Sequence, residues 1–363
     1  MKNKSEQEKR ISYRIEKVRD ALTVQQLDGI WITKKENQIY LCDFPSSNCF
    51  LLLTKDKNYL LTDFRYIEAA KDSCPMYEIV LINSEYSEID FLKEMQLSVI
   101  GCEDDTLTVN SYRKLTNEVQ HTKWQDCSGL VEQIRLIKDE YELDAIKRAA
   151  ALTDDCFSHM LSVLKPHMTE KEAALKIEFF FKKNGAMGLS FDSICVSGIR
   201  SSLPHGVPTD KKLEVGDFLT MDFGCILDGY CSDMTRTVAI GSVTPEQRQI
   251  YNLVLQAQKT AIEGLKAGMS CVEGDYLARQ VIIEAGYGDY FGHGLGHGVG
   301  LEIHEAPTLS PRGKGFLKEN MTVTIEPGIY LPQKFGIRIE DLAIITSFGI
   351  INTVHSEKEL III

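Results

Sequence analysis

The stretch FLTMDFGCILDGYCSDMTRTV, residues 218–238, decides the fold of the second half of the chain. Phe218–Gly224 and Tyr230–Val238 each have the composition of a β-strand, with β-branched and aromatic residues throughout. The dipeptide Asp228–Gly229 between them is a strong signal for a tight turn. The stretch therefore predicts a β-hairpin.

Two aspartates on this hairpin are unusual for a strand. In the predicted register Asp222 faces Thr235, and Asp233 lies two positions away on the same face, at a diagonal distance of roughly 7–8 Å. Aspartate is depleted in strands, and two ionised carboxylates in an apolar sheet repel each other. The hairpin alone leaves two explanations open. Either a cation holds both acids, or one caps a loop and the other pairs with Arg236.

A glycine ladder with histidines follows at residues 291–301, FGHGLGHGVGL. The spacing of His293 and His297 would suit a zinc-binding helix, but five glycines in nine residues exclude one, at roughly 1 kcal/mol each. The dinucleotide-binding glycine pattern does not fit the spacing either. In an extended chain the two histidines stand about 13 Å apart, so one metal centre can take only one directly. The other is expected to contact substrate or donate a proton, and His304 follows seven residues on.

Two glutamates in the last third also lie on predicted strands. Glu326 ends the strand that begins at Thr322, and Glu340 shares a face with Arg338 in the strand Gly336–Asp341. An exposed strand end and a plain Arg338–Glu340 salt bridge are the simpler explanations. The joint count of two aspartates, two glutamates and a histidine on strands favours a metal site.

The charges of this set indicate what it would bind. Four carboxylates balance two divalent cations, and a ligand set dominated by oxygen suits Mn²⁺, Co²⁺ or Fe²⁺ better than a sulfur-rich zinc site. Two such ions lower the pKa of a shared water and so supply a nucleophile at neutral pH.

The rest of the chain divides into two parts near residue 130. Residues 1–130 alternate helical and strand patterns, with a helix over Ile11–Leu27, a buried strand at Gly29–Ile32 and a hairpin over Phe50–Leu61. This predicts a small α/β domain without a phosphate loop or metal cluster. Residues 131–363 form the second predicted domain.

The second domain is predicted to open with two helices. The first runs from Asp139 to about Val163 and the second over Glu170–Lys183, where Thr169 and Glu172 have the spacing of a capping box.

Composition places the chain among ordinary globular proteins of the cytoplasm. It has 363 residues, 44% of them hydrophobic and 25% charged, with a net charge of −12. The acidic balance disfavours nucleic-acid binding, and no apolar run predicts a membrane span. The ten cysteines are scattered, so we expect reduced, buried thiols and no disulfide framework.

On these residues the chain resembles the pita-bread metallopeptidases, the family of methionine aminopeptidase, aminopeptidase P and prolidase. The resemblance covers the second domain, and the first resembles the creatinase-type N-terminal domain of the proline-specific members. It implies an α/β N-terminal domain followed by an α+β pita-bread catalytic domain.

The resemblance also implies roles for individual residues. The family's metal ligands fall on Asp222, Asp233, His297, Glu326 and Glu340. Asp222 would chelate one ion, His297 and Glu326 the other, while Asp233 and Glu340 would bridge both.

Catalytic and substrate-binding positions carry over in the same way. His205, His293 and His304 match histidines that contact the substrate and stabilise the tetrahedral intermediate. Glu326 would also shuttle a proton, and Tyr330 and Arg338 match positions near the bound peptide.

The implied activity is cleavage of short peptides before proline, with two divalent ions, most suitably Mn²⁺, in a homodimer. A methionine aminopeptidase-like activity and a metal-free peptide-binding relative are the alternatives. Whether the substrate is a dipeptide or a longer peptide stays open at this point.

Overall fold

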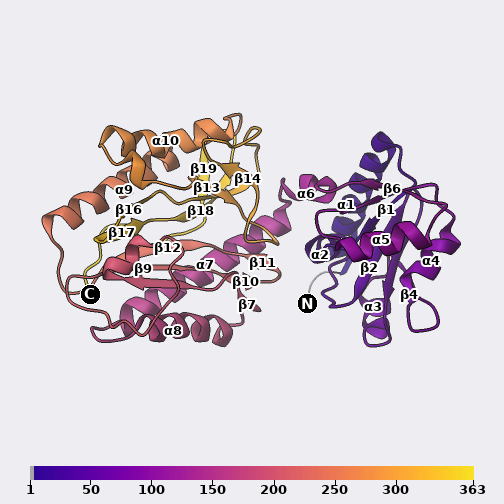
Figure 1. Cartoon of the computed structure of the whole chain (residues 1–363), viewed down its shortest axis with the longest axis horizontal. Helices are drawn as coiled ribbons and strands as arrows, with labels where there is room; N and C mark the ends of the chain where they lie inside the picture. Colours follow the sequence, from indigo (N-terminus) through magenta and orange to yellow (C-terminus); the bar gives the residue numbers. More distant parts are fainter. Residues whose placement is uncertain (1–3) are drawn as a thin grey trace. The chain divides into compact units, whose positions relative to one another are not determined.

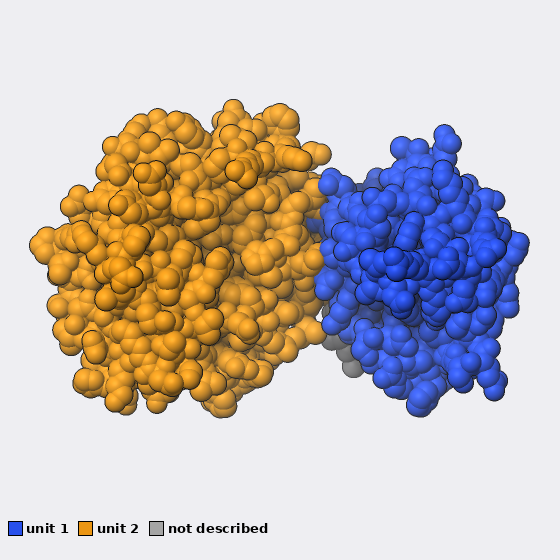
Figure 2. All heavy atoms as spheres, in the orientation of Figure 1, with its two compact units in different colours: residues 1–135 blue, residues 136–363 orange. Residues whose placement is uncertain are grey.

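The computed structural model describes residues 4–363, which form two compact units divided between Arg135 and Leu136 (Figure 2). The division falls just beyond residue 130, because a short helix at Leu130–Arg135 still belongs to the first unit. No helix within this described range is both long enough and apolar enough to span a membrane.

The first unit is an α/β layer structure (Figure 1). Its helices are α1 (Lys4–Gln25), α2 (Lys35–Cys42), α3 (Ile67–Ser73), α4 (Glu88–Met95), α5 (Val109–Glu118) and α6 (Leu130–Arg135). Its strands are β1 (Gly29–Ile32), β2 (Cys49–Thr54), β3 (Asn58–Thr62), β4 (Glu78–Leu81), β5 (Val99–Cys102) and β6 (Lys123–Asp126).

These strands form one mixed sheet in the order β4-β3-β2-β1-β5-β6. The strand at Gly29–Ile32 and the hairpin formed by β2 and β3 confirm the sequence predictions. Apolar residues of α4 and α5 pack with Trp31, Leu52 and Ile100 of the sheet to form a core. The first unit is thus stabilised by its own buried side chains.

The second unit carries longer helices and short strands. The helices are α7 (Glu140–Val163), α8 (Glu170–Lys183), α9 (Pro245–Gly264) and α10 (Cys271–Glu284), with 3₁₀ turns η1 (Gly198–Ser202) and η2 (Gly288–Tyr290). The strands before α9 are β7 (Gly188–Leu189), β8 (Ile194–Ser197), β9 (Phe218–Phe223), β10 (Cys225–Leu227), β11 (Tyr230–Cys231) and β12 (Met234–Ala239). Those after α10 are β13 (Gly296–Gly298), β14 (Glu305–Leu309), β15 (Thr322–Ile325), β16 (Gly328–Leu331), β17 (Phe335–Arg338), β18 (Asp341–Ile345) and β19 (Ile350–Asn352).

Within this unit the strands lie between two pairs of helices, α7 with α8 on one side and α9 with α10 on the other (Figure 1). One core joins α7 and α8 to residues of β8, β9 and β12, and a second joins α9 and α10 to β15 and β18. Helix α8 begins at a capping box formed by Thr169 and Glu172, as predicted. The strands between the cores can therefore carry polar side chains only where a partner or ligand is supplied.

The hairpin of residues 218–238 forms in the predicted register, because Asp222 pairs with Thr235 across β9 and β12. The two long strands predicted there are broken, however. The tip, β10 with β11, belongs to a separate sheet, and the chain changes sheets at Gly224 and at Ser232–Asp233. A Cβ on Gly224 would collide with the carbonyl of Ser232, so glycine is needed at this crossing.

The predicted strand Gly336–Asp341 is broken in the same way. β17 ends at Arg338 and β18 begins at Asp341, which leaves Ile339 and Glu340 between two sheets. Asp233 and Glu340 therefore both lie at points where the chain leaves one sheet for another. All ten cysteines lie in the described part of the chain and are buried, as predicted, and each is a free thiol there.

Candidate metal centre and active site

A cleft of about 540 Å³ opens in the second unit. It is lined by Phe191, Asp192, Ser193, Ile194, Pro204, His205, Gly206, Val207, Pro208, Asp222, Asp233, His293, Gly294, Gly296, His297, His304, Thr308, Ser310, Glu326, Arg338 and Glu340. Nine of the ten site residues singled out in the sequence belong to this lining. Tyr330 is the exception, since it is buried behind the cleft.

The five residues that match metal ligands lie on separate strands or just beyond strand ends, and all five line the cleft. Ligand atoms of Asp233, His297 and Glu340 all lie within 4.8 Å of one another. The Nε2 atom of His297 is 3.7 Å from Asp233 Oδ2 and 3.4 Å from Glu326 Oε1. We call Asp222, Asp233, Glu326 and Glu340 the acid cluster.

Glycines of the ladder let strand β13 lie close to its neighbours. A Cβ on Gly296 would collide with the carbonyl of Thr324, and one on Gly298 with the carbonyl of Ala306. This close approach sets His297 against the acid cluster.

Two threonine hydroxyls orient the glutamates. Thr235 Oγ1 donates to Glu340 Oε2 at 2.6 Å, and Thr324 Oγ1 donates to Glu326 Oε1 at 3.0 Å. Neither threonine was predicted from the sequence to belong to the site. The signal was present, because Thr235 faces Asp222 in the predicted register and Thr324 precedes Glu326 by two positions on the same face.

The acid cluster lacks the donors that its three buried carboxylates and the partly buried Glu326 need. Asp222 Oδ1 and Asp233 Oδ1 are buried and have no hydrogen-bond partner within residues 4–363. Such an orphaned acceptor costs about 1–3 kcal/mol, and more when charged. Burial and the neighbouring Asp222 and Glu326 raise the pKa of Asp233 well above its usual value. The set therefore fits divalent cations, which would satisfy the oxygens and offset their charge.

The pKa values of the two glutamates of the cluster are raised as well. Burial and the charges of Asp233 and Glu326 raise the pKa of Glu340 well above its usual value. Burial raises the pKa of Glu326 to about 7, against the opposing charge of Arg338. Without a cation, burial therefore favours the protonated form of these carboxylates.

Arg338 is fully engaged at the edge of the cluster. Its Nη2 donates to Asp222 Oδ2 at 2.5 Å, and its Nε donates to Thr235 Oγ1 at 3.0 Å. Its Nη1 donates to Tyr330 Oη at 2.8 Å and to the Pro204 carbonyl at 3.3 Å. The simple Arg338–Glu340 salt bridge is wrong, since the ion pair is made with Asp222. That bond occupies Asp222 Oδ2, whereas the buried Oδ1 has no hydrogen-bond partner within residues 4–363.

His297 is held in the tautomer that a metal ligand requires. Its Nδ1 lies 3.0 Å from the carbonyl of Gly298, and a carbonyl can only accept, so Nδ1 carries the proton. Burial lowers the pKa of His297, which favours the neutral ring. The lone pair of Nε2 then faces Asp233 and Glu326.

His293 has both ring nitrogens occupied. Its Nδ1 donates to the carbonyl of Gly294 at 2.8 Å, so Nε2 accepts from the Tyr330 hydroxyl at 2.9 Å. That hydroxyl in turn accepts from Arg338. Burial, with the charge of Arg338, lowers the pKa of His293 to about 4. A neutral His293 therefore fixes Tyr330 and, through it, the guanidinium.

His205 and His304 are exposed at the cleft, where a ligand can reach them. The ring of His304 lies 4.4 Å from that of His297, and burial with the neighbouring His297 lowers its pKa. His205 and His304 can therefore offer a ring nitrogen to a bound molecule. His293 cannot do so without breaking a hydrogen bond, because both of its ring nitrogens are occupied.

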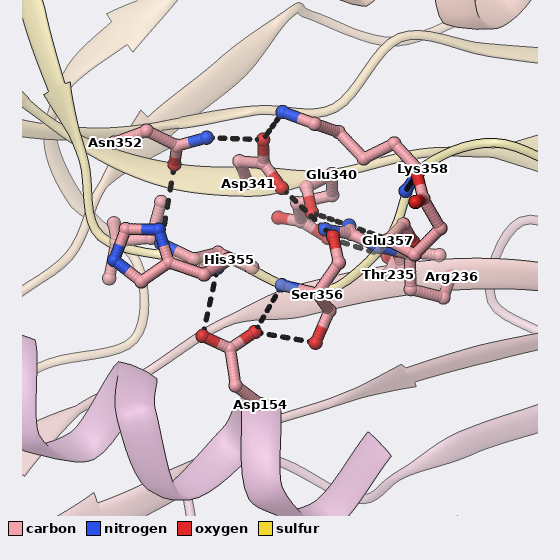
Figure 3. A network of polar contacts seen from close by, with 12 residues as sticks. Asp154, Thr235, Arg236, Glu340, Asp341, Asn352, His355, Ser356, Glu357 and Lys358 are labelled. Carbon is pink, nitrogen blue, oxygen red and sulfur yellow. Dashed lines mark hydrogen bonds and ion pairs between the residues drawn. The ribbon is translucent and has the colours of Figure 1, made fainter. Parts of the chain in front are cut away.

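A second buried network lies behind Glu340 (Figure 3). Arg236 Nη2 donates to Asp341 Oδ1 at 2.8 Å, and Arg236 Nη1 donates to the carbonyls of Thr235 and Glu340 at 3.0 and 2.6 Å. We call Arg236, Asp341, Lys358 and Asn352 the arginine network. Arg236 pairs with neither Asp222 nor Asp233, so the explanation that one of them is its partner is wrong.

The rest of this network joins the last residues to the strands (Figure 3). Lys358 and Asn352 both donate to Asp341 Oδ2, at 2.5 and 2.7 Å. Arg236 also donates to the carbonyls of Ser356 and Glu357. The arginine network thus holds, from behind, the backbone of two residues whose side chains meet in the acid cluster.

Both units of the chain match known protein families. The model of metallopeptidase family M24 matches residues 144–347, and that of the creatinase/prolidase N-terminal domain matches residues 14–137. The chain is 37% identical to an Xaa-Pro dipeptidase of Pyrococcus furiosus, over 96% of this chain and 99% of the relative.

Two solved structures are also similar over nearly the whole chain. An Xaa-Pro dipeptidase from Bacillus anthracis has a TM-score of 0.94 at 43% identity, covering 97% of this chain and all of that one. An X-Pro aminopeptidase from Thermotoga maritima has a TM-score of 0.88 at 35% identity, covering 93% of this chain and 98% of that one. The expected two-domain fold class is thereby confirmed.

Proposed function

The chain belongs to metallopeptidase family M24, whose members act with divalent metal ions, and on this premise we propose that it hydrolyses the peptide bond before proline with two such ions. The observation that carries the proposal is the pair of orphaned buried oxygens, Asp222 Oδ1 and Asp233 Oδ1, in a cleft that already holds His297 and two glutamates.

Five side chains would hold the ions. Asp222 would bind one ion, His297 and Glu326 the other, and Asp233 and Glu340 would bridge them. The tautomer of His297 and the Arg338 bond to Asp222 Oδ2 support these roles, because each leaves one lone pair directed at the cluster. The ligand set is rich in oxygen, so we favour Mn²⁺, with Co²⁺ or Fe²⁺ as substitutes.

When bound, the ions would supply a water of lowered pKa as nucleophile and polarise the scissile carbonyl. The chain's own residues then manage the protons. Glu326 Oε1 is engaged by Thr324, so Glu326 Oε2 would take the proton of the nucleophile and deliver it to the leaving proline nitrogen.

Substrate contacts fall to the exposed imidazoles. His205 and His304 would donate to the carbonyl oxygen as it gains charge. His293 would act through Tyr330, because both of its ring nitrogens are occupied. Tyr330 and Arg338 would hold the wall of the site in place.

The apolar part of the cleft supports specificity for proline. Phe191, Ile194, Pro204, Val207 and Pro208 line it together. A pyrrolidine ring has no N–H to donate once in a peptide bond, and it gains by covering apolar surface. The names of the similar proteins, Xaa-Pro dipeptidase and X-Pro aminopeptidase, point the same way.

The test is metal reconstitution followed by product analysis. Chelator-treated protein would receive Mn²⁺ and then a matched pair of tripeptides, Ala-Pro-Ala and Ala-Ala-Ala. We expect cleavage of the first peptide alone, before proline, and two bound ions per chain by calorimetric titration.

Three results would contradict the proposal. These are full activity in the presence of chelator, equal cleavage of both peptides, and release of methionine from a Met-Ala peptide in preference to either. Binding of only one ion per chain at saturation would contradict the proposed pair of ions but not the proposed peptidase activity. The homodimer stays a prediction for sedimentation to test.

A further inference from the structure

Three of the buried thiols gather at one place in the first unit. Cys42 ends α2, Cys49 begins β2, and Cys74 directly follows α3. The Sγ atom of Cys74 lies 3.6 Å from the carbonyl oxygen of Cys42, and the Cys42 thiol interacts with the thiols of both Cys49 and Cys74. We call these three residues the thiol cluster. Because 32 residues separate Cys42 from Cys74, no local motif in the sequence indicates it.

Two members of the thiol cluster line a small cavity. Cys42 and Cys74 share this lining with Met76, so two thiols and a thioether border one space. The volume of the cavity is about 10 Å³, close to that of one water-sized sphere. Gln7 and Glu8 of α1, both partly exposed, border the same cavity and give an ion access from solvent.

The donors around this cavity suit a soft cation with a low coordination number. Structural Zn²⁺ takes four ligands, whereas the described lining contains two thiols, one carboxylate and no histidine. Among the described residues, three Cys, His, Asp or Glu ligand atoms converge within 4.8 Å only in the acid cluster. Thiolate and thioether sulfurs select Cu⁺, which is satisfied by two or three of them.

The thiols of the cluster hold their protons until a metal replaces them. Burial, with the neighbouring thiols of Cys49 and Cys74, raises the pKa of the Cys42 thiol well above its usual value. Cys42 is 0% exposed and Cys74 is 3% exposed, so neither is a ready target for reagents in solution. A small cation that enters the cavity reaches both sulfurs at once.

We propose that the first unit binds one Cu⁺ ion between the sulfurs of Cys42 and Cys74, with Met76 as a third sulfur ligand. Two S–H bonds break, two Cu–S bonds form, two protons pass to solvent, and no electron is transferred. The bound group carries a net charge of −1. The positive charge of Arg19, which acts on Tyr77 in the same lining, offsets part of it.

The test is Cu⁺ binding by the reduced full chain under anaerobic conditions, with Mn²⁺ already supplied to the acid cluster. Bicinchoninate would compete for the Cu⁺ and remove loosely held ions. We expect one Cu⁺ per chain to be retained, with a thiolate-to-copper absorption band in the ultraviolet. Since Cu⁺ binds the folded unit, the melting temperature should also rise.

Single substitutions identify the ligands. Cys42→Ala and Cys74→Ala should each lower the affinity for Cu⁺ by at least about 100-fold, beyond the 10–100-fold typical of a residue outside the ligand shell. Met76→Leu conserves volume and should lower it by a smaller factor. Cys102→Ala, at a thiol of β5 that is 1% exposed in the same unit, is the matched control and should keep the affinity of the wild type.

X-ray absorption by the copper of the wild-type complex keeps the test independent of how the variants fold. A shell made of sulfur alone supports the proposal, and oxygen or nitrogen neighbours overturn it. Loss of all Cu⁺ to bicinchoninate, or wild-type affinity in Cys42→Ala and Cys74→Ala, overturns it as well. None of these measurements reads peptidase activity, so failure of the proposed function would leave the outcome unaffected.

Discussion

Glu340 and Asp341 are neighbours in the chain, and both side chains are almost completely buried, at 1% and 0% exposure. Glu340 turns toward Asp233 in the acid cluster, and burial with that neighbouring charge raises its pKa. Asp341 turns toward Arg236 and Lys358. Burial alone would raise its pKa too, but those two cations outweigh burial and lower it.

We call the acid cluster the front face and the arginine network the back face. The two faces differ in the hydrogen-bond partners of their carboxylates and not in how deeply these are buried. On the arginine network each carboxylate oxygen of Asp341 receives hydrogen bonds from the protein itself. In the acid cluster two oxygens receive none. A buried carboxylate with complete partners stabilises one fold, whereas one without partners requires a ligand. Removing a charge from each face should therefore have opposite consequences.

The largest expected effect is on turnover from the front face. Glu326→Gln should lower kcat by about 10³-fold or more, since it removes the proton acceptor and weakens one ion's coordination. The metal-free variant should unfold with an unchanged or larger free energy, because one of four crowded acids is gone. Rates would be measured at saturating Mn²⁺, with Glu263→Gln on the exposed face of α9 as control. A rate close to that of the wild type would refute the role of Glu326.

Substitutions on the back face should mainly change the free energy of unfolding. Arg236→Met leaves Asp341 buried with part of its partners, and breaking a buried pair in this way costs about 3–5 kcal/mol of unfolding free energy. The double variant Arg236→Met/Asp341→Leu should lose less than the sum of the single changes. Chemical denaturation would measure both. Arg248→Met, at an exposed arginine of α9, is the control, and a loss of equal size there would erase the contrast.

Metal should stabilise the protein through the front face alone. Mn²⁺ at a hundred times its Kd is expected to add about 2.7 kcal/mol to the free energy of unfolding. Asp233→Asn should abolish that increment, while the control Asp155→Asn, at an exposed acid of α7 outside the cleft lining, should keep it. Calorimetric melting with and without chelator would show it. An increment that survives in Asp233→Asn would place the ions elsewhere.

The smallest effect is the pH dependence of the metal-free protein. Burial raises the pKa of Glu326 from its ordinary value of 4.5 to about 7. A raised pKa means that the contribution is complete below about 4.5 and is lost as the pH rises through about 7, on the order of 2 kcal/mol. Denaturation in chelator at pH 5.5 and 8 should show the fall. Glu326→Gln should make the fall smaller without removing it, because the pKa values of Asp233 and Glu340 are raised as well. Asp341→Asn should leave the slope unchanged, because a lowered pKa keeps Asp341 ionised throughout this interval.

Much of the front face could be predicted from the sequence because its signals are local. The Asp228–Gly229 turn sets the pairing of Asp222 with Thr235, and the glycine ladder announces a close backbone approach around His297. Acids on apolar strands stand out against the usual composition of strands.

The rest depends on contacts that no local pattern records. The hairpin splits into two sheets at Gly224, because the Ser232 carbonyl lies where a Cβ would be. The bond from Arg338 to Asp222 spans 116 residues of chain, and the sequence offered Glu340 as the nearer partner. Ser193 lines the cleft with a buried Oγ that has no hydrogen-bond partner within residues 4–363, a feature that only the packed structure reveals.

The carbonyls that satisfy Arg236 belong to Ser356 and Glu357, which follow it by 120 and 121 residues. During synthesis a ribosome releases Asp222 and Asp233 long before it releases those partners. The hairpin that bears the first two acids therefore lacks the hydrogen bonds from Arg236 to Ser356 and Glu357 until nearly all of the described chain has emerged. Contacts so distant in sequence form late. Metal uptake would then mark a finished chain and would not nucleate an unfinished one.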